Sequence, residues 1–287
     1  MTKVIKRDGT RESLNIEKLH KVVTFACEEI AGVSASEVEI HSQIQFFDGI
    51  KTEDVQETLI KSAADLISEE TPNYQWVAGR LINYHLRKMV YGQFDPWDLY
   101  TLVIKNVENG FYDKDILVTY TKAEFNKLNS FIKHQRDNTL TYAAMEQFRG
   151  KYLVQNRVTK QIFETPQMAY MLIAMTLFQN YPKEMRIKWV KDYYDAISTF
   201  DISLPTPVMA GVRTPQRQFS SCVLIETDDS LDSINASTSS IVKYVSQKAG
   251  IGIGAGRIRA LGSTIRSGDA YHTGVIPFYK MFQSATR

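Results

Sequence analysis

The sequence is poor in three features that would each indicate a particular class of protein. It has only two cysteines in 287 residues, too few for a disulfide-rich secreted domain or a four-cysteine zinc ribbon. The longest apolar run, residues 168–178, is about half of the roughly 20 residues that span a bilayer, and it predicts a buried helix. No apolar stretch follows the charged N-terminal MTKVIKRDG, so we expect no signal peptide. These absences predict a cytoplasmic protein with no membrane partner.

An excess of charge of either sign is also missing. The chain has 34 Lys and Arg residues against 32 Asp and Glu residues, which gives a formal net charge of +2. This balance argues against direct, non-specific nucleic-acid binding, which depends on neutralising phosphates. With 44% apolar and 23% charged residues, the composition is that of a soluble globular protein. The length allows one to three domains.

Residues 1–92 are predicted to form a module of their own, a small strand cap on a four-helix bundle. Asp8-Gly9 suits the tight turn of a hairpin, because glycine adopts positive φ without strain. Apolar residues then recur at helical spacing along each expected helix. The helices are expected to begin at Asn15, Ser36, Thr52 and Thr71-Pro72, with the second ending near Phe47.

The rest of the chain divides into a helical part and a part with β character. Residues 93–199 predict helices over 98–110, 121–135, 166–180 and 182–199. From residue 200, DISLPTPVMAGV and FSSCVLIET are β-prone runs that predict buried strands. A helix over about 231–248 follows, capped by Asp228-Asp229-Ser230 and stopped by Gly250. Strand, helix and a further β-prone glycine loop predict the start of an α/β unit.

The glycine-rich run 250–256 has competing interpretations. A dinucleotide-binding loop lies between a strand and the following helix, whereas this run comes after a helix and leads into Arg257 and Arg259. The G-K-[ST] sequence of a P-loop is also missing. We therefore reject a dinucleotide fingerprint. From the residues alone, a glycine hinge with surface arginines is the plainer interpretation.

Three other features have both a structural and a functional interpretation. Cys222 is either a small buried hydrophobe or a reactive thiol. Thr206, whose neighbouring prolines fix its backbone, is either a turn residue or a preorganised contact. The basic residues of the N-terminal module are either solvated surface charges or a group that converges on phosphates. They are Lys6, Arg7, Lys18 and Lys88.

Several longer strings resemble a single family. V-I-K-R-D-G-T, N-I-E-K-L, F-D-G-I-K-T and H-L-R-K fall in residues 1–92, followed by YAAMEQFRGKYLVQNR, SLPTPVMAGVRTP, FSSCVL and TIRSG. Together they resemble the N-terminal portion of the large (α) subunit of class I ribonucleotide reductase. The resemblance implies a mainly α chain with an α/β part. An ATP-cone would occupy residues 1–92, a helical domain 93–199, and the opening strands of the ten-stranded α/β barrel 200–287.

The resemblance also implies two allosteric nucleotide sites. The activity site in the cone, for ATP or dATP, would comprise Lys6, Arg7, Glu12, Asn15, Lys18, Thr52 and Lys88. The specificity site, for a deoxynucleoside triphosphate or ATP, would comprise Asp229, Ser230, Leu231, Arg259 and Arg266. Relatives often have histidine where this chain has Gln56. Glutamine in place of histidine predicts weaker contacts between the cone and the phosphates. It also leaves inhibition by dATP open.

The catalytic residue that the resemblance implies is Cys222, one of two thiols that reduce the substrate and become a disulfide. Its thiol would protonate the leaving 2′-hydroxyl group, while Thr206 and Ser221 would bind the nucleoside diphosphate. Cys27 is expected to pack in the first helix and to form no bond with Cys222. No metal site is expected in this chain.

The family further implies partners that complete the enzyme. The radical cysteine, the thiol that pairs with Cys222, and the cysteine pair that accepts electrons from thioredoxin or glutaredoxin have no counterpart in this sequence. We therefore expect a complementary large-subunit fragment to carry the rest of the barrel, and this chain to be inactive alone. The metal–tyrosyl cofactor of the small (β) subunit would supply the radical. Two alternatives stay open: a nucleotide-sensing regulatory protein that uses the cone without catalysis, and a truncated or decayed gene product.

Overall fold

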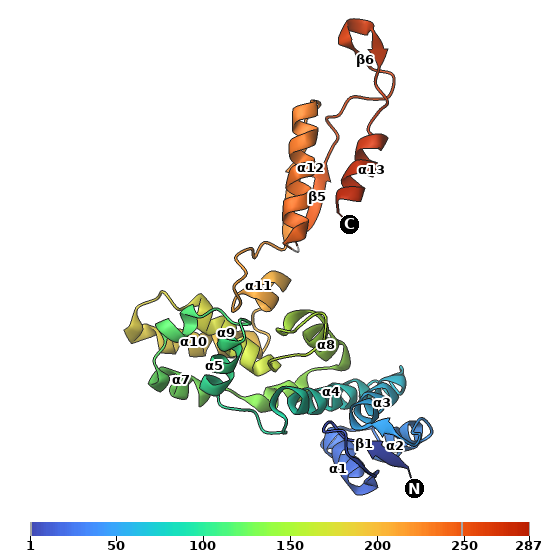
Figure 1. Cartoon of the computed structure of the whole chain (residues 1–287), viewed down its shortest axis with the longest axis vertical. Coiled ribbons are helices and arrows are strands. Elements are labelled where there is room, and N and C mark those ends of the chain that lie inside the picture. The colour runs from blue at the N-terminus through green and yellow to red at the C-terminus, as the bar shows by residue number, and fades with distance from the viewer. Residues whose placement is uncertain (1, 248, 287) are drawn as a thin grey trace. The chain divides into compact units, whose positions relative to one another are not determined.

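The computed structural model of the chain describes residues 2–247 and 249–286. It divides the chain into two compact units (Figure 1). The first is Met1–Leu204 with Val212–Pro215, and the second is Pro205–Gly211 with Gln216–Arg287. Helices dominate the first unit, while the second contains parallel strands.

The chain begins with the predicted hairpin, extended by a third strand. The strands lie in the order β2-β1-β3: β1 (Lys3–Ile5), β2 (Arg11–Ser13) and β3 (Ile50–Lys51). In the turn between β1 and β2, Gly9 has φ +84° and the Asp8 carboxylate accepts a 2.9 Å hydrogen bond from the Thr10 N–H. β3 pairs parallel with β1. The sequence pattern does not predict β3, because two residues are too few to show an alternation.

Four helices complete what we call the N-terminal module, β1 to α4. They are α1 (Ile16–Cys27), α2 (Ala35–Gln43), α3 (Thr52–Asp65) and α4 (Tyr74–Tyr91). The predicted strand cap on a four-helix bundle is confirmed (Figure 1). Asn15 caps α1 as predicted, since its Oδ1 accepts a 2.9 Å hydrogen bond from the Lys18 N–H.

Three of the predicted helix starts in the module are wrong. α4 begins at Tyr74, with Asn73 as its N-cap, rather than at Thr71-Pro72. Ser34, rather than Ser36, is the N-cap of α2, because Ser34 has extended backbone angles and Ser36 already lies inside the helix. This helix also ends before the predicted Phe47. Lys51, rather than Thr52, is the N-cap of α3. β3 leads directly into that helix, so Thr52 becomes its first residue and makes no side-chain cap.

α4 is the central helix of the first unit. It packs against α1 and α3 of the N-terminal module and against α8 (Tyr142–Gln147) of the segment that follows. Gly79 lets α4 approach the backbone at Leu140 closely, because a Cβ atom at position 79 would collide with the Leu140 carbonyl oxygen. One helix therefore belongs to the cores of both the module and the helices after it.

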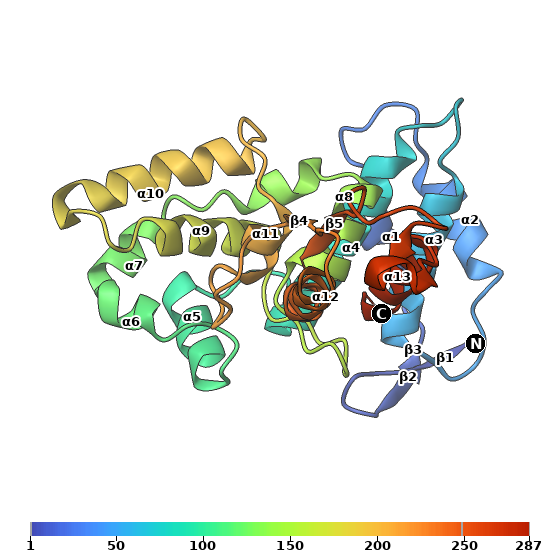
Figure 2. The same ribbon diagram turned by 90° about the horizontal axis from the view of Figure 1, so that it is seen from above.

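The helical segment, α5 to α10, largely follows the prediction. Its elements are α5 (Leu99–Glu108), α6 (Asp115–Thr119), α7 (Lys122–Asn129), η1 (His134–Thr139), α8, the π-helical turn η2 (Phe148–Tyr152), α9 (Pro166–Leu177) and α10 (Lys183–Ser198). The apolar run forms the buried helix α9, which lies beside α10 (Figure 2). The helix predicted over 121–135 is too long, because α7 ends at Asn129 and the chain turns before η1.

A buried ion pair ties the segment Val212–Pro215 into the first unit. Arg213 Nε donates to Oε2 of Glu164 at 2.8 Å, and its Nη2 donates to the Tyr152 carbonyl at 3.0 Å. The Tyr112 hydroxyl donates to the same carboxylate at 2.6 Å. Arg213 and Glu164 are almost fully buried, so the carboxylate depends on these donors for its charge.

The second unit contains a β-α-β arrangement. Its elements are α11 (Thr206–Gly211), β4 (Cys222–Glu226), α12 (Leu231–Ser246), β5 (Gly250–Gly254), β6 (Thr264–Ile265), η3 (Arg266–Gly268), β7 (Ala270–Tyr271) and α13 (Ile276–Ala285). β4 and β5 are parallel, and α12 connects them. The predicted α/β unit is confirmed, and the described residues contain no closed barrel.

Three predictions for the second unit are wrong in detail. DISLPTPVMAGV does not form a strand: it ends in α11, because Pro207 fits the first turn of a helix. FSSCVLIET does form β4, but the strand is not buried. The run 250–256 is not a loop, since Gly250–Gly254 is β5, whose backbone pairs with β4 in full register.

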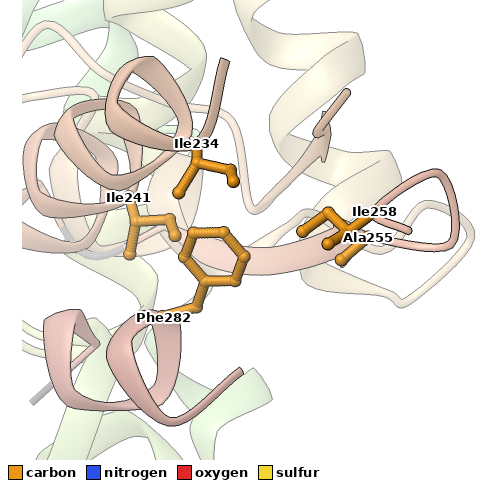
Figure 3. Close-up of a cluster of buried hydrophobic side chains, with 5 residues drawn as sticks. All are labelled: Ile234, Ile241, Ala255, Ile258 and Phe282. Carbon is orange, nitrogen blue, oxygen red and sulfur yellow. The ribbon is translucent and has the colours of Figure 1, made fainter. Parts of the chain in front are cut away.

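Side chains of alternating direction give the β4–β5 pair two different faces. One face packs on α12 and α13, where the core consists of Ile234, Ile241, Ala255, Ile258 and Phe282 (Figure 3). Ile225, Ile251 and Ile253 pack against this cluster from the strands. On the other face Leu224 is 86% exposed. Within residues 2–247 and 249–286, every helix is too short or too polar to span a membrane.

Candidate functional site

The N-terminal module contains a cavity of about 540 Å³, lined by the β1–β2 hairpin, α1, α3 and α4. All seven residues that the sequence predicts for an activity site line it: Lys6, Arg7, Glu12, Asn15, Lys18, Thr52 and Lys88. They come from every part of the module, and the fold brings them together. The volume is within the usual range of small-molecule sites.

The cavity is lined by both cationic and apolar side chains. Lys6 Nζ lies 3.2 Å from a carboxylate oxygen of Glu12, and Arg7 Nη1 donates to the Lys88 carbonyl at 2.6 Å. Thr52 lies in the first turn of α3, where backbone N–H groups are unpaired and favour an anion. Leu19, Val22, Phe25 and Tyr84 line the same cavity. The arrangement can hold phosphates beside an aromatic base.

Among the cavity residues that sequence reasoning missed are Lys21, Phe25 and Tyr84. A signal for two of them exists, because Lys18, Lys21 and Phe25 share one face of α1 at spacings of three and seven residues. Gln56 also lines the cavity, and its Oε1 is buried without a hydrogen-bond partner in the described residues. Gln56 therefore presents to the cavity an amide oxygen that receives no hydrogen bond from the hairpin or from α1.

Cys222 begins β4 with an exposed thiol, and the Ser221 hydroxyl lies 3.5 Å from its sulfur. Cys27 lies in α1 of the other unit, and burial raises its pKa to about 11. Both cysteines are free. Thr206 begins α11, on a different element of the second unit from Cys222. Among the described residues, no three His, Cys, Asp or Glu side chains gather to hold a metal ion.

The face that carries Cys222 is kept open by glycine. Cys222, Leu224 and Glu226 lie opposite Gly250, Gly252 and Gly254 in the β4–β5 register. A Cβ atom on Gly250 would lie 3.9 Å from the Cys222 sulfur, and one on Gly252 would lie 2.7 Å from Leu224 Cδ2. The glycines of the predicted hinge thus form a strip of bare backbone beside the thiol.

The predicted specificity residues lie at the carboxyl ends of β4 and β5. Asp229 Oδ2 accepts a 2.6 Å hydrogen bond from Arg259 Nε, and Oδ1 accepts one of 3.1 Å from the Arg259 N–H. These bonds lower the pKa of Asp229. Ser230 caps α12, and Leu231 is 79% exposed. Loops after adjacent parallel strands are the usual place for a ligand site in an α/β unit.

Arg266 is more distant along the chain, in the turn between β6 and β7, where its φ is +50°. Arg259 Nη1 donates to the Thr264 carbonyl at 3.4 Å, so the loop after β5 contacts the hairpin that carries Arg266. A second ion pair, not predicted from the sequence, is present here: Arg257 Nη1 lies 2.8 Å from Asp228 Oδ1. The sequence does contain a signal for this ion pair, since acidic residues follow β4 and basic residues follow β5.

Comparisons with known proteins agree along the whole chain. Family models match it as "ATP cone domain" over residues 2–89, "Ribonucleotide reductase, all-alpha domain" over 138–217 and "Ribonucleotide reductase, barrel domain" over 220–287. Ribonucleoside-diphosphate reductase 1 subunit alpha of Escherichia coli is 61% identical over 284 residues, covering 99% of this chain and 37% of the relative. The α subunit of Enterobacteria phage T4 is 48% identical over 286 residues, and that of Helicobacter pylori 35% over 283. The chain thus spans little more than a third of the length of these relatives.

Proposed function

Since the chain belongs to the ribonucleotide reductase α-subunit family, we propose that it takes part in reducing ribonucleoside diphosphates to 2′-deoxyribonucleoside diphosphates. The observation that carries this proposal is the exposed Cys222 thiol on the open face of β4 and β5. A reducing thiol must reach the substrate, and a thiol sealed in a core does not. Thr206 and Ser221 bind the substrate in this proposal.

The thiol chemistry requires a second sulfur. Cys222 donates a proton to the leaving 2′-hydroxyl group, which departs as water, and two thiols together supply two electrons as they join in a disulfide. In this proposal Cys27 packs in α1 and is not that second sulfur. We assign it to the remaining strands of the barrel. Thioredoxin or glutaredoxin then reduces the disulfide.

The remaining strands also cover the open face. β4 and β5 are two strands whose outer edges and Leu224 face are uncovered in the described residues. Uncovered edges favour pairing with further strands. We propose that a complementary large-subunit fragment supplies them, and that the small (β) subunit provides the radical from its metal–tyrosyl cofactor. The proposal keeps the domains expected from the sequence, with the ATP-cone over 1–92, the helical domain over 93–199 and the first part of the barrel over 200–287.

Two allosteric sites belong to the same proposal. The seven residues around the cavity of the N-terminal module bind ATP or dATP, with lysine and arginine on the phosphates. Asp229, Ser230 and Leu231 meet the sugar and base of a deoxynucleoside triphosphate, while Arg259 and Arg266 meet its phosphates. Asp229 pairs with Arg259, so the effector competes with this carboxylate for the guanidinium.

Reconstitution tests the proposal. The chain, the complementary fragment, the β subunit and a thioredoxin system are assayed together for CDP reduction, and each is then omitted in turn. Activity is expected only from the full mixture, and Cys222→Ser abolishes it. Cys27→Ser is the matched control and retains activity. An active Cys222→Ser mixture, or reduction by this chain alone, contradicts the proposal.

A further inference from the structure

A row of charged side chains leads from the nucleotide cavity to the helical segment. At its start Arg7, which lines the cavity, lies with Nε 3.2 Å from Oε1 of Glu53 on α3. At its end Glu57, one helical turn further along α3, accepts a 2.8 Å hydrogen bond from Nη1 of Arg149. α3 therefore carries one carboxylate toward the cavity and one toward the helical segment.

The helical end of this row is fixed in place. Arg149 lies in the π-helical turn η2 and makes two hydrogen bonds with Glu146, from Nε at 3.0 Å and from Nη2 at 2.6 Å. Its side chain is 25% exposed, and that of Glu57 is 45% exposed. Among the hydrogen bonds of the described residues, the Glu57–Arg149 bond is the one that joins α3 to the helical segment.

A buried histidine of α4 lies beside Glu57. His85 of α4 has Nε2 at 3.5 Å from Glu57 Oε1, and its Nδ1 is buried without a partner in the described residues. Burial lowers the pKa of His85, although the carboxylates of Glu57 and Glu53 act in the opposite direction and the cations Arg7 and Arg149 act with burial. All four charged groups of the row are thus close enough to His85 to affect it.

We infer that nucleotide binding in the N-terminal module is transmitted to the helical segment through the Glu57–Arg149 ion pair. This inference rests on the proposed nucleotide site and adds the route by which that site acts. Arg149 does not line the cavity, so it is a positioning residue that acts through Glu57.

The physical cause is competition for Arg7. A triphosphate brings several negative charges to the cavity and draws the Arg7 guanidinium away from Glu53. Glu53 is then an unpaired carboxylate four residues before Glu57, and like charges at this spacing repel. Glu57 becomes more dependent on His85 and Arg149, which tightens the bond between α3 and η2. By reciprocity, weakening Glu57–Arg149 weakens nucleotide binding by the same factor.

Hydrogen–deuterium exchange of the whole chain, with and without ATP, tests the inference. In the wild type, ATP should slow exchange in peptides from α1 and in peptides covering Phe148–Tyr152. In Glu57→Gln and in Arg149→Gln, ATP should still protect α1 but should no longer protect Phe148–Tyr152. The change on adding ATP, rather than the absolute exchange rate, separates transmission from a merely structural role.

Affinity gives the second measurement. Calorimetric titration with ATP should show the dissociation constant raised about two- to fivefold in each variant, the size expected for a partly exposed ion pair. The double variant Glu57→Gln/Arg149→Gln should lose no more than either single variant. Arg157→Gln, at an exposed arginine of the same segment, is the matched control and should behave as wild type.

The outcomes distinguish the two proposals. If the wild type binds ATP but ATP leaves Phe148–Tyr152 unchanged, or if both variants keep the response, the transmission route is wrong and the nucleotide site stands. If the wild type does not bind ATP, the nucleotide site and the route are both overturned.

Discussion

Cys222 and Gly250 are partners at the first position of the parallel β4–β5 pair, so no side chain of β5 stands beside the thiol. The same relationship repeats along the strands, where glycine lies opposite each residue on the face of Cys222. Ile251 and Ile253, which alternate with these glycines along β5, point to the opposite face and pack into the core of the second unit. One short strand therefore supplies both a packed face and a bare one.

Filling that bare face should shield the thiol. Gly250→Val places a branched side chain next to Cys222, because even a Cβ atom would lie 3.9 Å from the sulfur. We expect alkylation of Cys222 by iodoacetamide at pH 8 to slow severalfold, measured by mass spectrometry of the labelled peptide. Gly256→Val is the control, since a Cβ there meets nothing within 4 Å. An unchanged rate in Gly250→Val would show that β5 does not border the thiol.

Removing a cation from the cavity should weaken ATP binding strongly. Lys18→Ala and Lys88→Ala each remove a charged donor, and a hydrogen bond to a charged group contributes about 1.5–3 kcal/mol, or roughly 10- to 150-fold in affinity. Titration calorimetry at constant salt measures the loss. Lys127→Ala, on the exposed side of α7, should leave the affinity unchanged. Equal affinities in all three variants would remove these lysines from the phosphate site.

Substitution of Gly79 should destabilise the first unit. Gly79→Ala forces α4 away from the Leu140 carbonyl, a backbone group that cannot rotate aside. Overpacking of this kind costs roughly 1–3 kcal/mol or more, measured as a lower urea midpoint with the slope unchanged. Gly150→Ala is the matched control, because a Cβ there meets nothing within 4 Å. A loss in Gly79→Ala no larger than that of the control would contradict the packing.

Removing one partner of the buried ion pair should lower the stability of the protein more than removing both partners. Arg213→Met leaves the Glu164 carboxylate buried without its cation, and such a loss costs roughly 3–5 kcal/mol. The double variant Arg213→Met/Glu164→Met removes both charges and should recover part of this loss. Thermal unfolding of the two variants checks the order. A double variant less stable than Arg213→Met would show that the pair itself, rather than the unpaired charge, controls stability.

Stability should fall as pH rises toward neutrality because of Asp137. This carboxyl group is fully buried, and burial raises its pKa to about 7, although Gln167 donates a 2.9 Å hydrogen bond to it. Between the ordinary pKa near 4 and the folded value, the folded state binds the proton and the unfolded state releases it. The contribution to stability is therefore complete below pH 4 and is lost by about pH 7.

Asp137→Asn isolates this effect, because asparagine keeps the acceptor for Gln167 and does not ionise. The variant should be more stable than wild type at pH 8 by a few kcal/mol, at about 1.4 kcal/mol per unit of pKa difference, and similar to it at pH 4. Urea unfolding across this range measures the difference. A constant difference at all pH values would contradict the titration of Asp137.

Much of the local structure could be predicted from the sequence, because short-range patterns determine it. The hairpin at Asp8-Gly9, the cap at Asn15 and the cap at Ser230 each depend on a few adjacent residues, and all are confirmed. Errors arose where an element depends on its partner. The glycine run resembles a loop by composition, and it becomes β5 only because β4 satisfies its backbone hydrogen bonds.

The sequence by itself determined the family of the chain, its helices, and which residue types are available to bind a nucleotide. Only the tertiary structure decided which of them meet. Residues from the hairpin, α1, α3 and α4 line one cavity because the strands and helices of the module pack together. Likewise, Glu57 reaches Arg149 because α3 packs on α4, and α4 packs on α8 just before η2. Local patterns contain no information about such pairs, since packing between elements far apart in the chain sets these distances.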